Sequence, residues 1–160
     1  PLFDKYDPFY SENMELITNM EGLGSLNSKH ATQLTIKKSQ LQPIDTEMIS
    51  SFMNISVFEH MKQIKFEGWF YWKNYSHNNL NSYAIILISE KGTAYRYKVK
   101  KNYHYPNENG MYKGNPKLTG FLLAAYTDTI PAGTYKVIWE VARGITQKKE
   151  YYEEEKEVEI

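Results

Sequence analysis

The chain has 160 residues, with 19 basic and 19 acidic side chains and no cysteine. This length predicts a single domain that can bury a core without covalent staples. The absence of cysteine excludes disulfides, zinc–thiolate sites and a thiol nucleophile. A net charge of zero argues against a nucleic-acid partner, and no apolar run is long enough to span a membrane.

Residues 1–30 predict an irregular arm or linker that precedes the folded domain. Pro8, Gly22 and Gly24 punctuate this polar stretch, and Ser11 could cap one short helix within it. The remaining residues, 31–160, form the predicted domain.

The residues from 31 onward carry the period-two alternation that is typical of β-strands. Residues 45–58 also fit a short helix capped by Asp45, but a strand at 50–58 is favoured. Tyr83–Ile88 is apolar on both parities, as in a strand covered on both faces. The predicted strands are 31–38, 50–58, 63–72, 82–89, 93–101, 119–126, 134–142 and 146–152, followed by a charged tail.

Seven or eight short strands separated by turn residues predict an all-β fold, an immunoglobulin-like antiparallel β-sandwich. One parity of these strands should form the core. The predicted core residues are Phe66, Phe70, Ile85, Leu87, Tyr97, Phe121, Leu123, Val137 and Trp139. The last strand should lie at an edge, where its Glu and Lys side chains would prevent pairing with other chains.

Enzymatic signatures are weak in this sequence. The histidines are widely spaced, at positions 30, 60, 77 and 104, so surface positions explain them better than metal ligation does. Glu67 and Glu140 fall within strands and could form a glycosidase-like carboxylate pair, but exposed strand positions beside lysines are the simpler interpretation. We therefore expect no enzymatic activity, no cofactor and no metal.

Aromatic residues give a better functional indication. Trp69 and Tyr71 have the parity opposite to the core, a polar loop with Tyr75 follows, and the long segment 102–118 is also rich in rings. Rings beside short polar groups suit sugars and protein surfaces alike. Two alternatives to a binding role remain open. Each tyrosine could be present only because tyrosine favours β-strands, and Trp69 could be a core residue covered by the N-terminal arm. The candidate ligand-binding residues are Trp69, Tyr71, Tyr75, Tyr103, His104, Tyr105 and Tyr112.

Two stretches suggest a family. One comprises Ile64–Trp72, Tyr83–Ser89 and Tyr95–Val99, and the other comprises Thr119–Phe121 and Ile130–Val137, in which Gly133 and Tyr135 fit a tyrosine corner. Over residues 64–142 the chain resembles the β-sandwich accessory domains of bacterial cell-envelope glycosyltransferases and teichoic-acid polymerases. The resemblance implies a non-catalytic role in glycan binding, substrate positioning or oligomerisation.

The expected partner is therefore a glycan or cell-wall polymer, and the expected location is the bacterial cell envelope, on its cytoplasmic face or at the cell surface. The alternative is a protein–protein interaction or adhesin-like surface domain, including a homo-oligomer. A small glycan-active enzyme ranks below both.

Overall fold

The structure, a computed structural model, describes residues 30–104 and 117–160, together with the backbone of 107–108 and 111–112. The predicted arm, apart from residue 30, lies outside the described residues, so the division into arm and domain stays a prediction.

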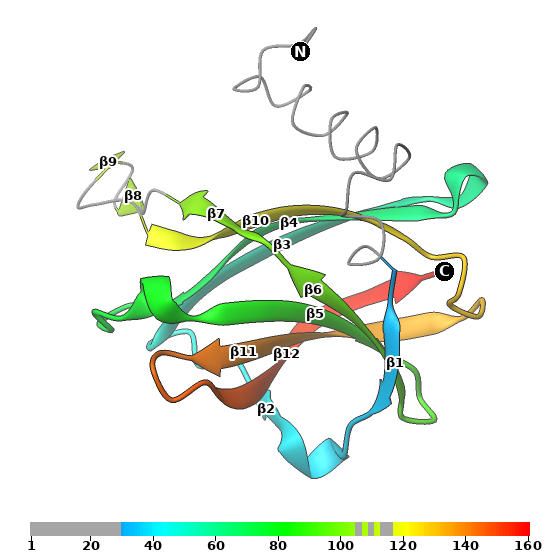
Figure 1. Cartoon of the computed structure of the whole chain (residues 1–160), viewed down its shortest axis with the longest axis horizontal. Helices are drawn as coiled ribbons and strands as arrows, with labels where there is room; N and C mark the ends of the chain where they lie inside the picture. Colours follow the sequence, from blue (N-terminus) through cyan, green and yellow to red (C-terminus); the bar gives the residue numbers. More distant parts are fainter. Residues whose placement is uncertain (1–29, 105–106, 109–110, 113–116) are drawn as a thin grey trace, which may run out of the picture.

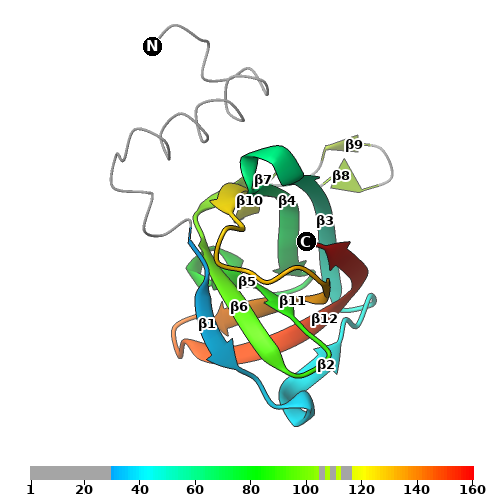
Figure 2. The same ribbon diagram turned by 90° about the vertical axis from the view of Figure 1, so that its right-hand side faces the viewer.

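Two sheets pack face to face as a β-sandwich (Figures 1 and 2). In spatial order the larger sheet contains β1 (Thr32–Thr35), β6 (Thr93–Val99), β5 (Ser82–Ile88), β11 (Thr134–Arg143), β12 (Lys148–Glu159) and β2 (Leu41–Pro43). The smaller sheet contains β3 (Ile49–Phe58), β4 (Gln63–Trp72), β10 (Lys117–Tyr126) and β7 (Lys101–His104). A separate ribbon pairs β8 (Asn107–Glu108) with β9 (Met111–Tyr112).

The predicted all-β sandwich is confirmed. The described residues contain no α-helix, only single 3₁₀ turns at Lys38–Gln40, Glu59–Met61 and Asn78–Leu80. Each predicted strand is present, although the first is shorter, ending at Thr35 instead of residue 38. The two main sheets hold ten strands rather than seven or eight, because the short β2 and β7 also join them.

The core lies between the sheets and is built from one parity of each strand. All nine predicted core residues are buried. The indole of Trp139 on β11 lies 5.2 Å from the rings of both Phe70 and Phe121, which belong to the opposite sheet. Its N–H donates to Glu154 Oε2 at 2.7 Å, so the polar atom of this fully buried ring has a partner.

The predicted tyrosine corner is present at the entry to β11. The Tyr135 hydroxyl donates to the backbone carbonyl of Pro131 at 2.5 Å. This bond fixes the 131–134 turn against the strand that follows it.

The last strand differs from its prediction in length and in position. β12 continues to Glu159, and it lies between β11 and β2 rather than at an edge. A register shift opposite Lys136–Ile138 places two extra residues in β12, so the inward positions Tyr152 and Val158 keep the same parity on both sides of the shift. The Lys156 ammonium group donates to the carbonyl of Met53 on the edge strand β3.

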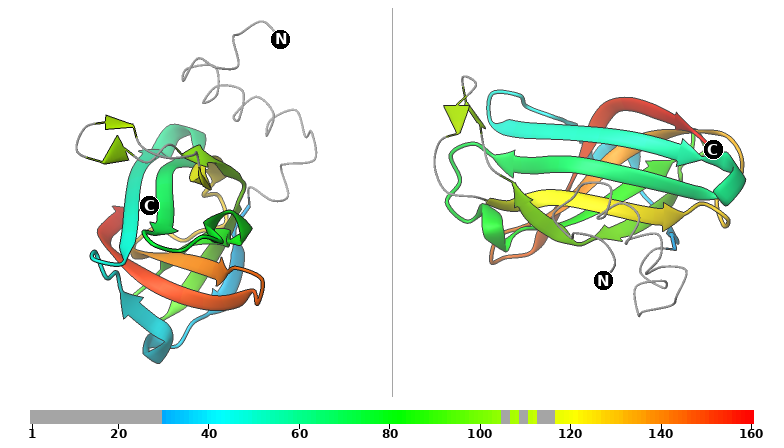
Figure 3. Two further views of the ribbon diagram at one scale, coloured as in Figure 1. Left: turned by 90° about the vertical axis from the view of Figure 1, so that its left-hand side faces the viewer. Right: turned by 90° about the horizontal axis from the view of Figure 1, so that it is seen from above.

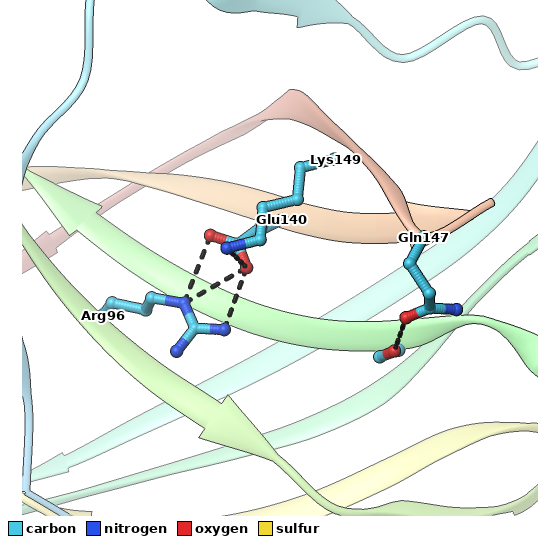
Figure 4. Close-up of polar contacts among 5 residues, drawn as sticks. Arg96, Glu140, Gln147 and Lys149 are labelled. Carbon is cyan, nitrogen blue, oxygen red and sulfur yellow. Dashed lines mark hydrogen bonds and ion pairs between the residues drawn. The ribbon is translucent and has the colours of Figure 1, made fainter.

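The outer face of the six-stranded sheet contains a buried charge, which corrects the expectation that Glu140 is exposed. The Glu140 side chain is 4% exposed and accepts three hydrogen bonds from the Arg96 guanidinium at 2.9–3.1 Å (Figure 4). The Lys149 ammonium group lies 3.8 Å away. Glu67 lies on the outer face of the other sheet, so the two carboxylates cannot form a catalytic pair.

An apolar cluster beside this ion pair explains the burial. Ile36, in the segment that runs from β1 to β2, belongs to one buried apolar cluster with Ile86 and Ile138 of the sheet. The segment thus covers part of the outer face, which is why β5 is apolar on both parities.

Replacing Leu87 by Ala should destabilise the fold by about 2–5 kcal/mol, because the side chain is fully buried between the sheets. Chemical unfolding curves measure this loss. A loss below about 1 kcal/mol would contradict the role of Leu87 in the core.

Replacing Arg96 by Met should cost about 3 kcal/mol, because Glu140 then keeps a buried charge without its main partner. The double variant Arg96→Met/Glu140→Leu should recover most of this loss in the same unfolding experiment. Lys149→Ala is the control, with a small effect, since that side chain is largely exposed. Equal losses in the single and double variants would show that the cost is not electrostatic.

Candidate ligand-binding groove

Three aromatic rings from three different strands stack on the outer face of the four-stranded sheet. The Trp69 ring on β4 lies 4.2 Å from the His104 ring on β7, with an interplanar angle of 10°. On its other side the Phe52 ring of β3 lies 4.9 Å away at 28°. We call Phe52, Trp69 and His104 the ring stack.

A glycine on the intervening strand permits this stack. Gly120 of β10 pairs with Trp69 on one side and with Asn102 of β7 on the other. A Cβ atom at this position would lie 3.3 Å from both the Asn102 carbonyl oxygen and the His104 Cβ. The missing side chain therefore leaves room for the imidazole to cross β10 and reach the indole.

The ring stack borders an open groove of about 280 Å³. Its polar lining comes from Glu67 and Asn102, and Tyr103, which is 63% exposed, is also a lining residue. The Asn54 amide donates to the Glu67 carboxylate at 3.0 Å, and the Lys65 ammonium lies 4.0 Å from it. The full lining is Phe52, Glu67, Gly68, Trp69, Asn102, Tyr103, His104, Gly120 and Phe121.

The groove has both neutral and charged groups around its rings. Burial lowers the pKa of His104 below its usual value, which favours the neutral imidazole in the stack. Lys117 and Lys156 place their ammonium groups 5.5 and 5.8 Å from the ring centroids of Tyr71 and Phe52. The Trp69 N–H donates to the Ser50 hydroxyl at 3.2 Å and is thus already paired.

The structure brings together some of the candidate ligand-binding residues. Trp69, Tyr103 and His104 line the groove. Tyr71 is nearby, 5.8 Å from the His104 ring, but buried. Tyr75 is not part of the groove and packs against Trp72 instead.

The other two candidates, Tyr105 and the side chain of Tyr112, lie outside the described residues. Sequence reasoning missed Phe52, Asn102 and Gly120. For Phe52 the sequence contained a signal, because this residue has the outward-facing parity of its strand. Its pairing with Trp69 is seen only in the structure.

The orientation of Trp69 limits how a ligand can use it. Both faces of the indole are covered, one by Phe52 and the other by His104. A ligand in the groove therefore meets the edges of the ring stack, and the exposed Tyr103 offers the more accessible ring.

Within the part of the chain that the structure describes, His, Asp and Glu form no group of three that could hold a metal ion. The same residues include no helix long and apolar enough to cross a membrane. No protein-family model, curated protein or solved structure matches this chain. The resemblance to envelope accessory domains therefore stays a prediction.

The lowered pKa of His104 gives a testable dependence of stability on pH. Above the unfolded-state pKa of about 6.5 the imidazole is neutral in both states and the stack keeps its full stability. As the pH falls below that value the unfolded state binds the proton first, so the free energy of unfolding decreases until the folded pKa is passed.

The titration of the His104 ring by NMR should give a pKa below about 6.5. In His104→Gln the corresponding decrease in unfolding free energy should disappear. A measured pKa at or above the unfolded value would contradict the burial of the imidazole in the stack.

Proposed function

We propose that the chain is a non-catalytic carbohydrate-binding module and that the groove beside the ring stack is its glycan site. The observation that carries the proposal is the combination, in one open groove, of ring surfaces with a carboxylate and an amide. The C–H face of a sugar is apolar and packs on rings, while its hydroxyl groups need directional polar partners.

Each part of the groove has a defined role in this proposal. The exposed ring of Tyr103 packs on the sugar face, and the edges of the ring stack form the adjoining wall. The Glu67 carboxylate accepts hydrogen bonds from hydroxyl groups, because carboxylate oxygens have more acceptor sites than the Asn54 amide occupies. The Asn102 side chain can both donate and accept.

The rigid sheet supports this role. The groove is formed by the four strands of the smaller sheet, β3, β4, β10 and β7, whose register is set by backbone pairing. Little conformational entropy is then lost when a ligand binds, apart from the rotamers of exposed side chains such as Tyr103. The module would position glycan for a bacterial cell-envelope protein, a context supported by the resemblance of residues 64–142.

A glycan array followed by titration of the strongest ligand tests the proposal. Tyr103→Ala should weaken binding about tenfold or more with little change in melting temperature, because the ring is exposed. The double variant Tyr103→Ala/Tyr105→Ala should abolish binding. Glu67→Gln keeps the shape of the side chain and should weaken binding through the lost charge.

Lys98→Ala is the matched control, since Lys98 is exposed on β6 of the other sheet. A glycan that binds all these variants with wild-type affinity would place its site elsewhere. A large drop in the melting temperature of Tyr103→Ala would show that this ring is structural.

A second candidate function is protein binding by strand addition. Among the described residues, β7 ends the four-stranded sheet, so one side of its backbone has no neighbouring strand there. An extended peptide can pair with such an edge. The other edge strand, β3, is less accessible, because Lys156 occupies the Met53 carbonyl. Binding of a partner that survives Tyr103→Ala but not Asn102→Pro would favour this function.

A further inference from the structure

One end of the sandwich presents two loops that are tied to each other. The loop 73–81 connects β4 to β5, the turn 144–147 connects β11 to β12, and both lie at the left-hand end in Figure 1 and in the right-hand view of Figure 3. The Gln147 amide donates to the Leu80 carbonyl at 3.1 Å, and the Gly144 N–H donates to the Asn81 side chain at 2.8 Å. We call the two loops together the basic tip.

The basic tip exposes two large aliphatic side chains. Ile145 is 80% exposed and Leu80 is 48% exposed. Gly144 and Gln147 adopt φ values of 56° and 53°, which fix the turn that carries Ile145. The Gln147 side chain also accepts a hydrogen bond from Ser82 at 2.7 Å (Figure 4). The turn is therefore held in one conformation, with the Ile145 side chain in solvent.

A buried asparagine fixes the other loop in the same way. The side chain of Asn78 accepts a hydrogen bond from the Trp72 N–H at 3.1 Å and donates to the Trp72 carbonyl at 2.7 Å. This amide thus satisfies both backbone polar groups of Trp72, and it fixes the loop at its start. Tyr75 and His77, whose rings meet at 5.6 Å, lie on the same loop.

The charge of the basic tip differs from that of the whole chain. The two loops with the strand ends beside them, residues 73–82 and 143–149, contain Lys73, Arg143, Lys148 and Lys149 but no Asp or Glu, although the chain as a whole has zero net charge. Two of these cations face carboxylates on the sheet, since Arg143 lies 4.0 Å from Glu150 and Lys149 lies 3.8 Å from Glu140. The guanidinium of Arg143 is held over the rings of Trp72 and Tyr75, at 4.4 and 5.0 Å. Of the acidic residues of β12, Glu150 lies beside Arg143, whereas those at positions 153–159 lie farther along the strand, away from this end.

We propose that the basic tip docks on the surface of a lipid bilayer that carries anionic headgroups. Ile145 and Leu80 enter the boundary between headgroups and acyl chains, while the basic side chains contact the lipid phosphates and carboxylates. Tyr75 suits the same interface, because its ring is apolar and its hydroxyl is polar. A soluble polyanion would use the charges but would leave the two aliphatic side chains in water.

Vesicle flotation of the whole chain tests this proposal, with phosphatidylcholine vesicles that contain or lack phosphatidylserine. The chain should float only with the anionic vesicles, and added salt should release it. Leu80→Ser/Ile145→Ser should lose this binding. Lys148→Ala should weaken it about fivefold, the effect of one basic side chain near such a surface.

Met61→Ser is the matched control, since Met61 is 50% exposed on the turn at the opposite end of the sandwich. It should float like the wild type, and near-ultraviolet circular dichroism should show that every variant is folded. Absence of flotation with anionic vesicles overturns the proposal. Equal flotation of the wild type and the Leu80→Ser/Ile145→Ser variant also overturns it. Binding to polyuridylate, a soluble polyanion, without binding to vesicles has the same consequence.

Discussion

The packing of Trp139 against the opposite sheet is the interaction on which the rest of the molecule depends. Its ring touches Phe70 of β4 and Phe121 of β10, and both of these residues are next in sequence to an outward-facing position of the groove. Because side chains alternate along a strand, fixing the inner residue also fixes the outer one. The positions of Trp69 and Gly120 on the outer face thus follow from the core beneath them.

The groove shows how the absence of a side chain can shape a surface. Gly120 gives the imidazole of His104 a path to Trp69, and the resulting stack uses both faces of the indole. The three rings together form one wall of the groove. The cost is that the largest ring of the surface offers only its edge, so recognition shifts to Tyr103 and to the polar groups of Glu67 and Asn102.

The two proposed surfaces differ in their physical character. The groove is built on paired strands and combines rings with short polar groups, which suits a ligand with many hydroxyl groups. The basic tip is built on loops held by amide hydrogen bonds, and it combines aliphatic side chains with cations. Their tests are independent, because the variants for one surface leave the residues of the other unchanged.

The sequence by itself determined the all-β sandwich, the place of its eight main strands along the chain and the core, but not the short β2 and β7 or the interior position of β12. Alternation places Phe66, Phe70, Ile85 and Leu87 inside, and this signal is local, since each strand carries it within a few residues. It also identified Trp69, Tyr103 and His104 as candidates for a site.

Only the tertiary structure placed those three residues together and separated Tyr75 from them, because their distances depend on strand order and register rather than on spacing along the chain. The burial of Glu140 has the same cause: its partner Arg96 lies on another strand, and the segment that covers the neighbouring apolar cluster comes from residues near 36. Pairing between distant segments leaves no periodic trace in either of them, so these features were decided by the assembled fold.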